Sequence, residues 1–136
     1  MVALTESRLT PKRDGARFSR PVAAGATIFG GAIVALTAAG LATPGATAVG
    51  LTVDGIAKAD ADNSSGAAGD IAVEVEKGVF RFANSAGADE ITAAEIGDTA
   101  YLVDDQTVAK TDGAASRSTA GKIVDVDAQG VWIDLT

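Results

Sequence analysis

Short runs of alternating apolar and polar residues, separated by glycine-rich breaks, cover most of this 136-residue chain. In residues 71–82 (IAVEVEKGVFRF), apolar residues alternate with glutamates up to Glu76, and beyond Gly78 the apolar positions shift by one, to Phe80 and Phe82. Alternation is typical of a strand with one buried face, and a shift of one residue is typical of a bulge or tight turn. This segment therefore predicts two strands with a break between them.

An uncharged run from Pro21 to Val53 is open to three interpretations: a membrane span, a secretion signal, or strands of a compact fold. A spanning helix needs roughly 20 mostly apolar residues, whereas glycines interrupt this run. A signal peptide begins with a short basic region, whereas here some twenty polar residues, acids among them, come first. We therefore expect a strand at 32–36, a turn at 37–40 and a return strand at 41–43, because glycine favours turns over helix.

The same pattern continues to the end of the chain. Alternation shifts again at Asp54–Gly55, and two hairpins are predicted, 100–103 with 107–110 and 123–127 with 131–135. Between them, Thr92 and Glu95 have the spacing of a capping box, which predicts one helical turn. The predicted fold class is mainly β: a small barrel or sandwich of short antiparallel strands with one helical turn and an extended N-terminal arm.

The last hairpin leaves the single tryptophan on its polar face. Trp132 either lies under a loop in a second small cluster or forms a subunit contact, since tryptophan is enriched in interface hot spots. Together with Phe80 and Phe82 it is the candidate subunit interface. The face predicted to be buried is shared by Val124, Val126, Val131, Ile133 and Leu135.

Composition limits the size of the core. Of the apolar residues 29 are alanine, so large apolar side chains are few. One body with a thin core is expected, without a second independent core, and burial against other subunits would stabilise it.

Charge divides the chain into two parts. Residues 1–20 carry five basic and two acidic residues, whereas the remainder carries six basic and sixteen acidic residues. This predicts a basic arm (1–20) on an acidic, β-rich body (21–136), with the arm either solvated or bound to a negatively charged partner. Nucleic acid is disfavoured because the basic residues are diluted by acids. The candidate binding residues of the arm are Arg8, Lys12, Arg13, Arg17 and Arg20.

The sequence offers little for catalysis. It has no cysteine and no histidine, which removes thiolate chemistry, the commonest metal ligand and the usual proton shuttle. Asp104–Asp105 and the pair Asp125 and Asp127 fit turns and solvent-facing positions better than acid–base catalysis. Residues 60–71 lack the glutamate that ends a calcium loop. We expect no enzyme, no cofactor and no metal site.

Several stretches resemble the capsid cement, or head decoration, proteins of tailed bacteriophages, particularly the Mu-like group. They are ARFSRPVAAGATIFGGAIVALTAAGLATPG, VGLTVDGIAKADADNSSGAAGD, VEVEKGVFRFANS, IGDTAYLVDDQTVAKT and AGKIVDVDAQGVWIDL, which together cover most of residues 16–135. The resemblance lies in the order of these segments, since no single motif among them is diagnostic.

The resemblance implies a non-enzymatic virion protein that binds the outside of the head, commonly as a homotrimer, and stabilises the shell against internal DNA pressure. Its partners would be the major capsid protein and further copies of itself, without nucleic acid or membrane. It would act on the outer capsid surface, and be found in the host cytoplasm during assembly. The alternative is a secreted or surface bacterial β-domain with residues 21–48 as a signal segment.

Overall fold

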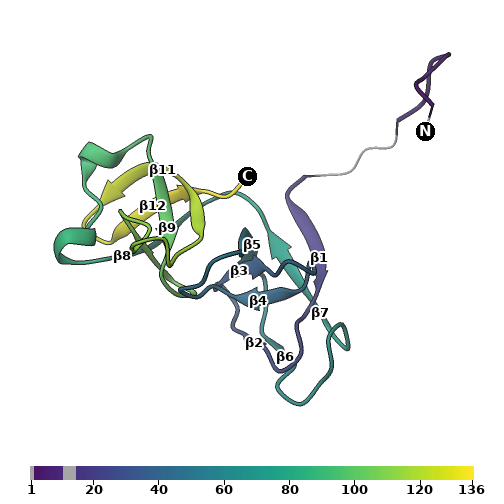
Figure 1. Cartoon of the computed structure of the whole chain (residues 1–136), viewed down its shortest axis with the longest axis horizontal. Helices are drawn as coiled ribbons and strands as arrows, with labels where there is room; N and C mark the ends of the chain where they lie inside the picture. The colour runs from purple at the N-terminus through teal and green to yellow at the C-terminus, as the bar shows by residue number, and fades with distance from the viewer. Residues whose placement is uncertain (1, 11–14) are drawn as a thin grey trace.

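The computed structural model of the chain describes residues 2–10 and 15–136 (Figure 1). The described residues are mainly β, as predicted, with two short 3₁₀ turns and no α-helix. The strands are β1 Arg17–Pro21, β2 Thr27–Ile28, β3 Ile33–Leu36, β4 Ala42–Pro44, β5 Thr52–Ala57, β6 Ala61–Asp62, β7 Ala72–Glu76, β8 Val79–Asn84, β9 Thr99–Leu102, β10 Thr107–Ala109, β11 Thr119–Asp127 and β12 Gly130–Asp134, and the turns are η1 Gly87–Asp89 and η2 Ala93–Glu95.

The strands form an open sheet and a closed barrel. The sheet has the order β1-β7-β5-β3-β4, and the barrel has the order β10-β8-β12-β11-β9 and closes through β9 and β10. Strands β2 and β6 form a separate antiparallel pair. All of these pairs are antiparallel except β8 with β10. Both architectural features of the prediction, antiparallel strands and a small barrel, are therefore confirmed.

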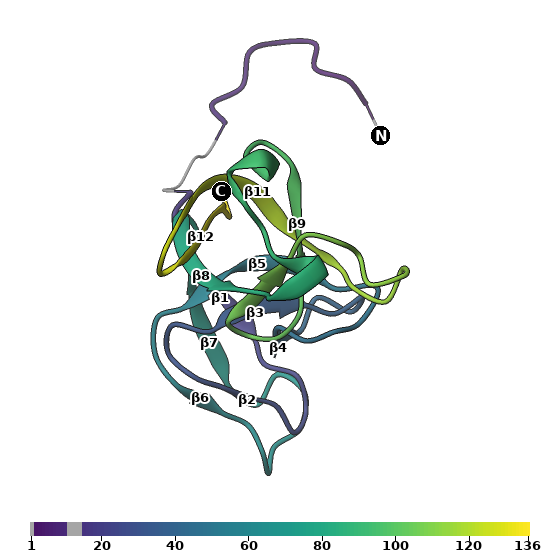
Figure 2. The ribbon, with the colours of Figure 1, turned by 90° about the vertical axis from the view of Figure 1, so that its left-hand side faces the viewer.

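Strand β3 lies between two clusters of buried residues, at the junction of sheet and barrel (Figures 1 and 2). Ile33 and Ala35 belong to the barrel core, whereas Val34 on the opposite face belongs to the core of the sheet. Successive side chains of a strand point to opposite faces. The chain therefore has two clusters that share a strand rather than two independent cores, and alanines fill positions in both.

The uncharged run folds as predicted for strands. β3 and β4 pair antiparallel, and between them Gly40 has φ +79° and donates its N–H to the Thr37 carbonyl oxygen. Among the residues that the structure describes, no helix is long and apolar enough to cross a membrane.

The two predicted shifts in alternation have different structural causes. In β5 the register against β3 slips between Val53 and Gly55, so Asp54 is an extra residue in a bulge. At Lys77–Gly78 the chain instead leaves the sheet after β7 and enters the barrel as β8. The second shift thus marks a crossing between the two parts of the molecule.

The predicted capping box is present. The Thr92 side chain accepts the Ala94 N–H, the Glu95 side chain accepts the Thr92 N–H, and the turn they flank is 3₁₀. These contacts satisfy amide groups that the first turn of a helix leaves unpaired.

The buried face predicted for the last hairpin needs a correction. A bulge in β11 between Ile123 and Asp125 turns Val124 outward, where it is 44% exposed, and buries Ile123 completely. Val131, Ile133 and Leu135 are buried as predicted. A bulge inserts one residue and so reverses the facing of the positions before it, which simple alternation did not show.

The boundary between arm and body also moves. Arg17–Pro21 forms β1, which pairs with β7 at the edge of the sheet, so the body begins at residue 17 and not at residue 21. Residues 1–16 are called the N-terminal tail below. Its described part, 2–10, has no strand or helix and lies apart from the sheet and the barrel in Figure 1.

Candidate functional site

The N-terminal tail combines exposed apolar side chains with a small positive charge. Val2 is 91% exposed, Leu4 69% and Leu9 97%. Arg8 is also exposed, whereas the candidates Lys12 and Arg13 lie outside the described residues. With three basic and two acidic residues, the tail has a charge of +1, less than the +3 that residues 1–20 carry together. Burial of its apolar side chains would therefore contribute to any binding by the tail, beside its charge.

The other two basic candidates belong to the body and are engaged there. Arg20 Nε donates to Asp54 Oδ2 at 2.7 Å, and Arg20 Nη2 donates to Asp54 Oδ1 at 3.1 Å. Arg17 lies near two glutamates of β7, 3.8 Å from Glu74 and 3.7 Å from Glu76. Both residues thus belong to β1, where Arg20 is hydrogen-bonded to Asp54 and Arg17 is largely exposed beside the two glutamates.

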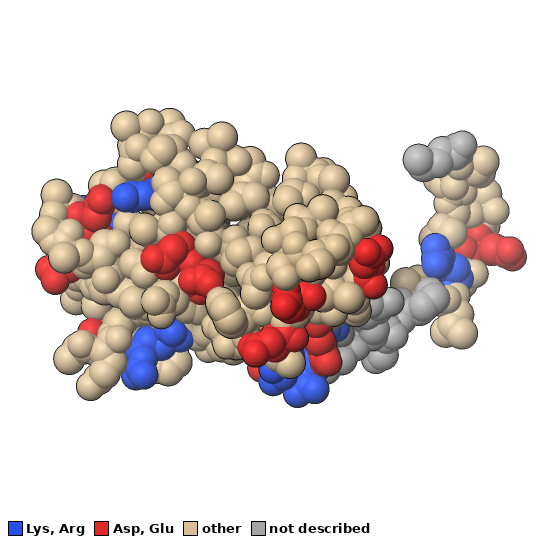
Figure 3. Space-filling model, turned by 90° about the horizontal axis from the view of Figure 1, so that it is seen from below, with Lys and Arg blue, Asp and Glu red and all other residues tan. Residues whose placement is uncertain are grey.

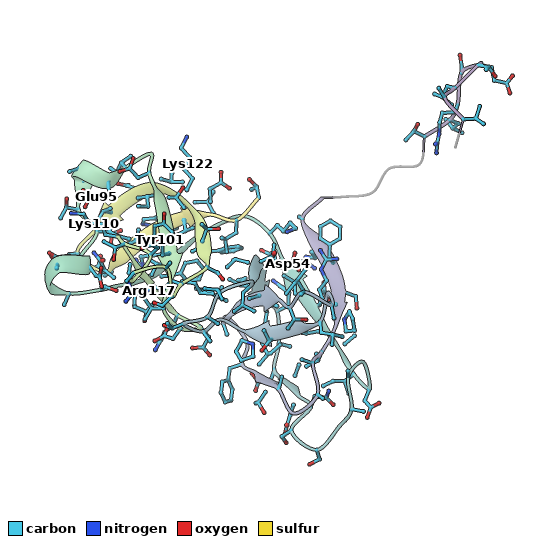
Figure 4. All side chains as sticks on the ribbon, viewed as in Figure 1. Asp54, Glu95, Tyr101, Lys110, Arg117 and Lys122 are labelled. Atoms are coloured by element: carbon cyan, nitrogen blue, oxygen red, sulfur yellow. The ribbon has the colours of Figure 1, made fainter. Side chains whose placement is uncertain are left out.

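Asp54 is the most deeply buried charged side chain among the described residues, 4% exposed (Figure 4). Lys77 Nζ adds hydrogen bonds to its Oδ1 at 2.9 Å and to its backbone oxygen at 2.7 Å. Burial by itself raises the pKa of this carboxyl group, but the hydrogen bonds from Arg20 and Lys77 outweigh burial, and the pKa is lowered. Asp54 is therefore a structural anion with no proton to exchange near neutral pH.

Trp132 lies on the outer face of the barrel and belongs to neither buried cluster. Its Nε1 donates to Asp127 Oδ2 at 2.9 Å, and the Arg81 guanidinium lies 5.7 Å from its ring centroid. The half-buried ring is thus held in one orientation by a hydrogen bond and a cation–π contact. A fixed aromatic ring loses little side-chain freedom on binding, so Trp132 remains a candidate contact.

The two phenylalanines of the candidate interface lie elsewhere. Phe82 is 7% exposed and is part of the barrel core, and Phe80 is half-buried and packs against that core. Alternation predicted their shared face, whereas only the barrel's closure shows that this face points inward. Neither ring therefore lies on the outer face of the barrel as Trp132 does.

Two of the aspartates considered for acid–base chemistry, Asp104 and Asp127, accept backbone N–H groups of turns. Asp104 Oδ1 accepts the Gln106 N–H at 2.9 Å, and Asp127 Oδ1 accepts the N–H groups of Gln129 and Gly130. The hydrogen bond from Trp132, together with these amides, lowers the pKa of Asp127. A carboxyl group that acts as a general acid near neutral pH needs a raised pKa, and the contacts of Asp127 act in the opposite direction.

The polar loop at residues 60–70 is held by its own hydrogen bonds. The buried Asn63 side chain donates to the carbonyl oxygens of Ala23 and Ala67, at 3.0 and 2.9 Å. Asp62 and Asp70 accept backbone N–H groups within the loop. Across the described residues, no group of three or more acidic side chains is placed to hold a metal ion.

A hollow of about 480 Å³ in the described surface lies at one end of the barrel beside the β11–β12 turn. Its lining includes Asn84 and Asp127, whose side chains are already bonded: Asn84 to the backbone of Ile91, and Asp127 to the turn and Trp132. Polar groups that orient a small ligand must be available to it, and these two side chains are already engaged in the protein's own hydrogen bonds.

The surface charge of the body is mainly acidic (Figure 3). Residues 17–136 carry sixteen acidic and eight basic residues, and five of those eight basic residues are in ion pairs with carboxylates. The body therefore carries a net negative charge of 8.

No family model, no curated protein and no solved structure matches this chain.

Proposed function

We propose that this chain is a structural virion protein, a capsid decoration protein that binds the outer surface of a phage head and stabilises the shell. The observation that carries the proposal is the exposed segment at residues 2–10, which precedes an edge strand of a compact, acidic β body. Extended segments of this kind bind large surfaces by laying side chains and backbone along a partner.

The body suits a binding role more than a catalytic one. Asp104 and Asp127 accept backbone N–H groups of turns, and Asp54 is in an ion pair. Two polar side chains that line the hollow beside the β11–β12 turn, those of Asn84 and Asp127, are already bonded within the protein. We propose the major capsid protein as the partner, contacted by the tail and by the body. An oligomer, with Trp132 at the contact between copies, would bring several tails to one shell, so modest single contacts would add up.

Residues 27–44 bear on the alternative of a secreted domain. They include β3, which contributes Ile33 and Ala35 to one core and Val34 to the other. Removal of residues 1–48 as a signal segment would take this strand out of both cores. Large losses of buried apolar residues unfold small domains, which favours the decoration role. Mass measurement of the mature chain separates the two, since cleavage would remove about 48 residues.

Binding to heads tests the proposal directly. Purified protein mixed with phage heads that lack it should cosediment with them and saturate at a fixed ratio. A variant without residues 1–14 keeps β1 whole and should bind at least tenfold more weakly, because each lost contact is multiplied over the copies of an oligomer.

A melting curve that matches the full chain would show that the shortened body is folded. Undiminished binding of the shortened chain would exclude the tail as the attachment, and no saturable binding by the full chain would exclude decoration.

A further inference from the structure

Strand β1 joins the tail to the body. Its backbone pairing by itself holds it only weakly in the sheet. It is an edge strand that pairs only with β7, over Arg17 to Pro21. Chain ends and edge strands are the usual places for local opening. Beside its backbone pairing with β7, the contacts of its side chains oppose opening of β1.

On the inner face of the sheet, β1 is tied to a strand with which it does not pair. Phe18 and Arg20 lie opposite the buried residues Val75 and Val73, so they share the face that covers the sheet core. From there Arg20 reaches past β7 to Asp54 on β5, with two hydrogen bonds.

Lys77, just after β7, completes this group of residues. Its Nζ lies 2.9 Å from Asp54 Oδ1, and both cations lie over the Phe18 ring, with Arg20 4.9 Å and Lys77 5.8 Å from its centroid. We call Phe18, Arg20, Asp54 and Lys77 the Asp54 cluster. It connects β1, β5 and the end of β7 through one buried carboxylate.

The backbone of β5 is shaped for this arrangement. Asp54 is the extra residue of the bulge opposite β3, and a side chain at Gly55 would collide with the Glu76 carbonyl oxygen and the Val75 side chain. The bulge and the missing side chain together let β5 lie close to β7, and so place the carboxylate within reach of Arg20.

A second set of ion pairs lies on the opposite face of the same three strands, the face on which Ile56 packs against the barrel core. Arg17 of β1 lies 3.7 Å from Glu76 of β7, and Lys58, which follows β5, lies 2.7 Å from the same carboxylate. These side chains are more exposed than Asp54, so salt should weaken this set first. Strand β1 is thus held by charge on both faces.

We propose that the Asp54 cluster makes β1 a mechanical anchor, which passes a pull on the tail into the sheet instead of letting β1 peel away. The pull itself rests on the proposed function, because it arises only when the tail is bound to a partner. Backbone hydrogen bonds run perpendicular to paired strands, so a pull along β1 strains all its bonds to β7 together. If β1 peeled away from β7, these hydrogen bonds would break one at a time. The Asp54 cluster opposes peeling because it ties β1 to β5, on the other side of β7.

Hydrogen exchange on the free full-length chain tests the anchor without any partner. Asp54→Asn keeps the size of the side chain and removes its charge, leaving Arg20 and Lys77 without their carboxylate. We expect amides of residues 16–22 to exchange at least tenfold faster in this variant, while barrel amides keep their wild-type rates. The matched control is Asp89→Asn, which removes the carboxylate partner of Arg117 in the barrel part and should leave residues 16–22 unchanged.

Equal exchange of residues 16–22 in wild type and Asp54→Asn would overturn the anchor, as would an equal rise in every strand of the molecule. If Asp54→Asn does not fold, the same exchange measurement is made on Arg20→Met. This variant removes the contact between β1 and Asp54 but leaves the ion pair of Asp54 with Lys77.

Force measurements on the full chain, pulled from its two ends, then test the mechanical part. The first rupture should occur at lower force in Asp54→Asn than in Asp89→Asn, and equal forces would contradict the proposal. These readouts need no phage head, so loss of head binding in any other experiment would count against the proposed function and not against the anchor.

Discussion

Three consecutive residues near the loop tip at 113–115 adopt the left-handed conformation. Gly113 has φ +62°, and the two alanines that follow have φ +59° and +66°. For residues other than glycine this region costs roughly 1–2 kcal/mol each. The strain is held by local contacts, since Ser116 and Arg117 donate their N–H groups to the Asp112 carbonyl oxygen, and Arg117 also pairs with Asp89 at 3.2 Å.

Replacing one of these alanines by glycine should stabilise the protein. Ala114→Gly relieves the steric cost of a positive φ, and after the larger entropy of the unfolded chain is subtracted we expect a gain of roughly 0.5–1 kcal/mol in the free energy of unfolding. Chemical denaturation measures it. Ala128→Gly is the matched control, because Ala128 is an exposed turn residue without a positive φ and the change there should not stabilise.

At the scale of elements, β11 decides how the barrel closes. It pairs with β12 along one part and with β9 along another, and its register slips at two bulges. Gly121 lies beside the slip against β9, where a side chain would collide with the Asp134 carbonyl oxygen and the Ile133 side chain. The close approach of β11 and β12 therefore depends on the absence of a side chain at this position.

Gly121→Ala should accordingly destabilise the barrel by about 1–3 kcal/mol, the usual cost of forcing extra atoms into a packed site. The exposed neighbour Lys122 provides a control, since Lys122→Ala should change stability by no more than about 0.5 kcal/mol. Thermal unfolding of both variants measures the difference. Equal melting temperatures for the two would show that β11 can move away without cost.

Across the whole molecule, several carboxylates accept hydrogen bonds that lower their pKa values. Hydrogen bonds from Thr111, Thr92 and Lys58 lower the pKa values of Asp89, Glu95 and Glu76 respectively, and Asp54 and Asp127 shift in the same direction. A carboxyl group whose pKa is lower in the folded state contributes stability above its unfolded pKa, and that stability is lost as pH falls through the folded value. The chain also has no histidine.

The melting temperature should therefore stay nearly constant from about pH 5.5 to 8 and fall steeply below about pH 4, where unfolded carboxyl groups take up protons. Calorimetry over this range measures the profile. Asp54→Asn should show a shallower acid slope than the wild type, because one of the shifted groups is gone. A drop in melting temperature between pH 6 and 8 would contradict this account.

The sequence by itself determined the class and most of the strands. Period-two alternation and glycine breaks located the hairpin of β3 and β4, both C-terminal hairpins and the capping box at Thr92, because these features depend on residues close together in the chain. The absence of histidine and cysteine also removed thiolate chemistry and the usual proton shuttle. This conclusion needs no knowledge of the fold, because it depends on composition alone.

Tertiary structure alone decided which charges are free and which faces are buried. In the sequence, only a break in the alternation marks Asp54. Its partners Arg20 and Lys77 lie 34 and 23 residues away from it along the chain. Closure of the barrel buried Phe82, the β11 bulge turned Val124 outward, and pairing with β7 drew Arg17 and Arg20 into the body. Each of these outcomes depends on contacts between distant strands, whose register local pattern does not specify.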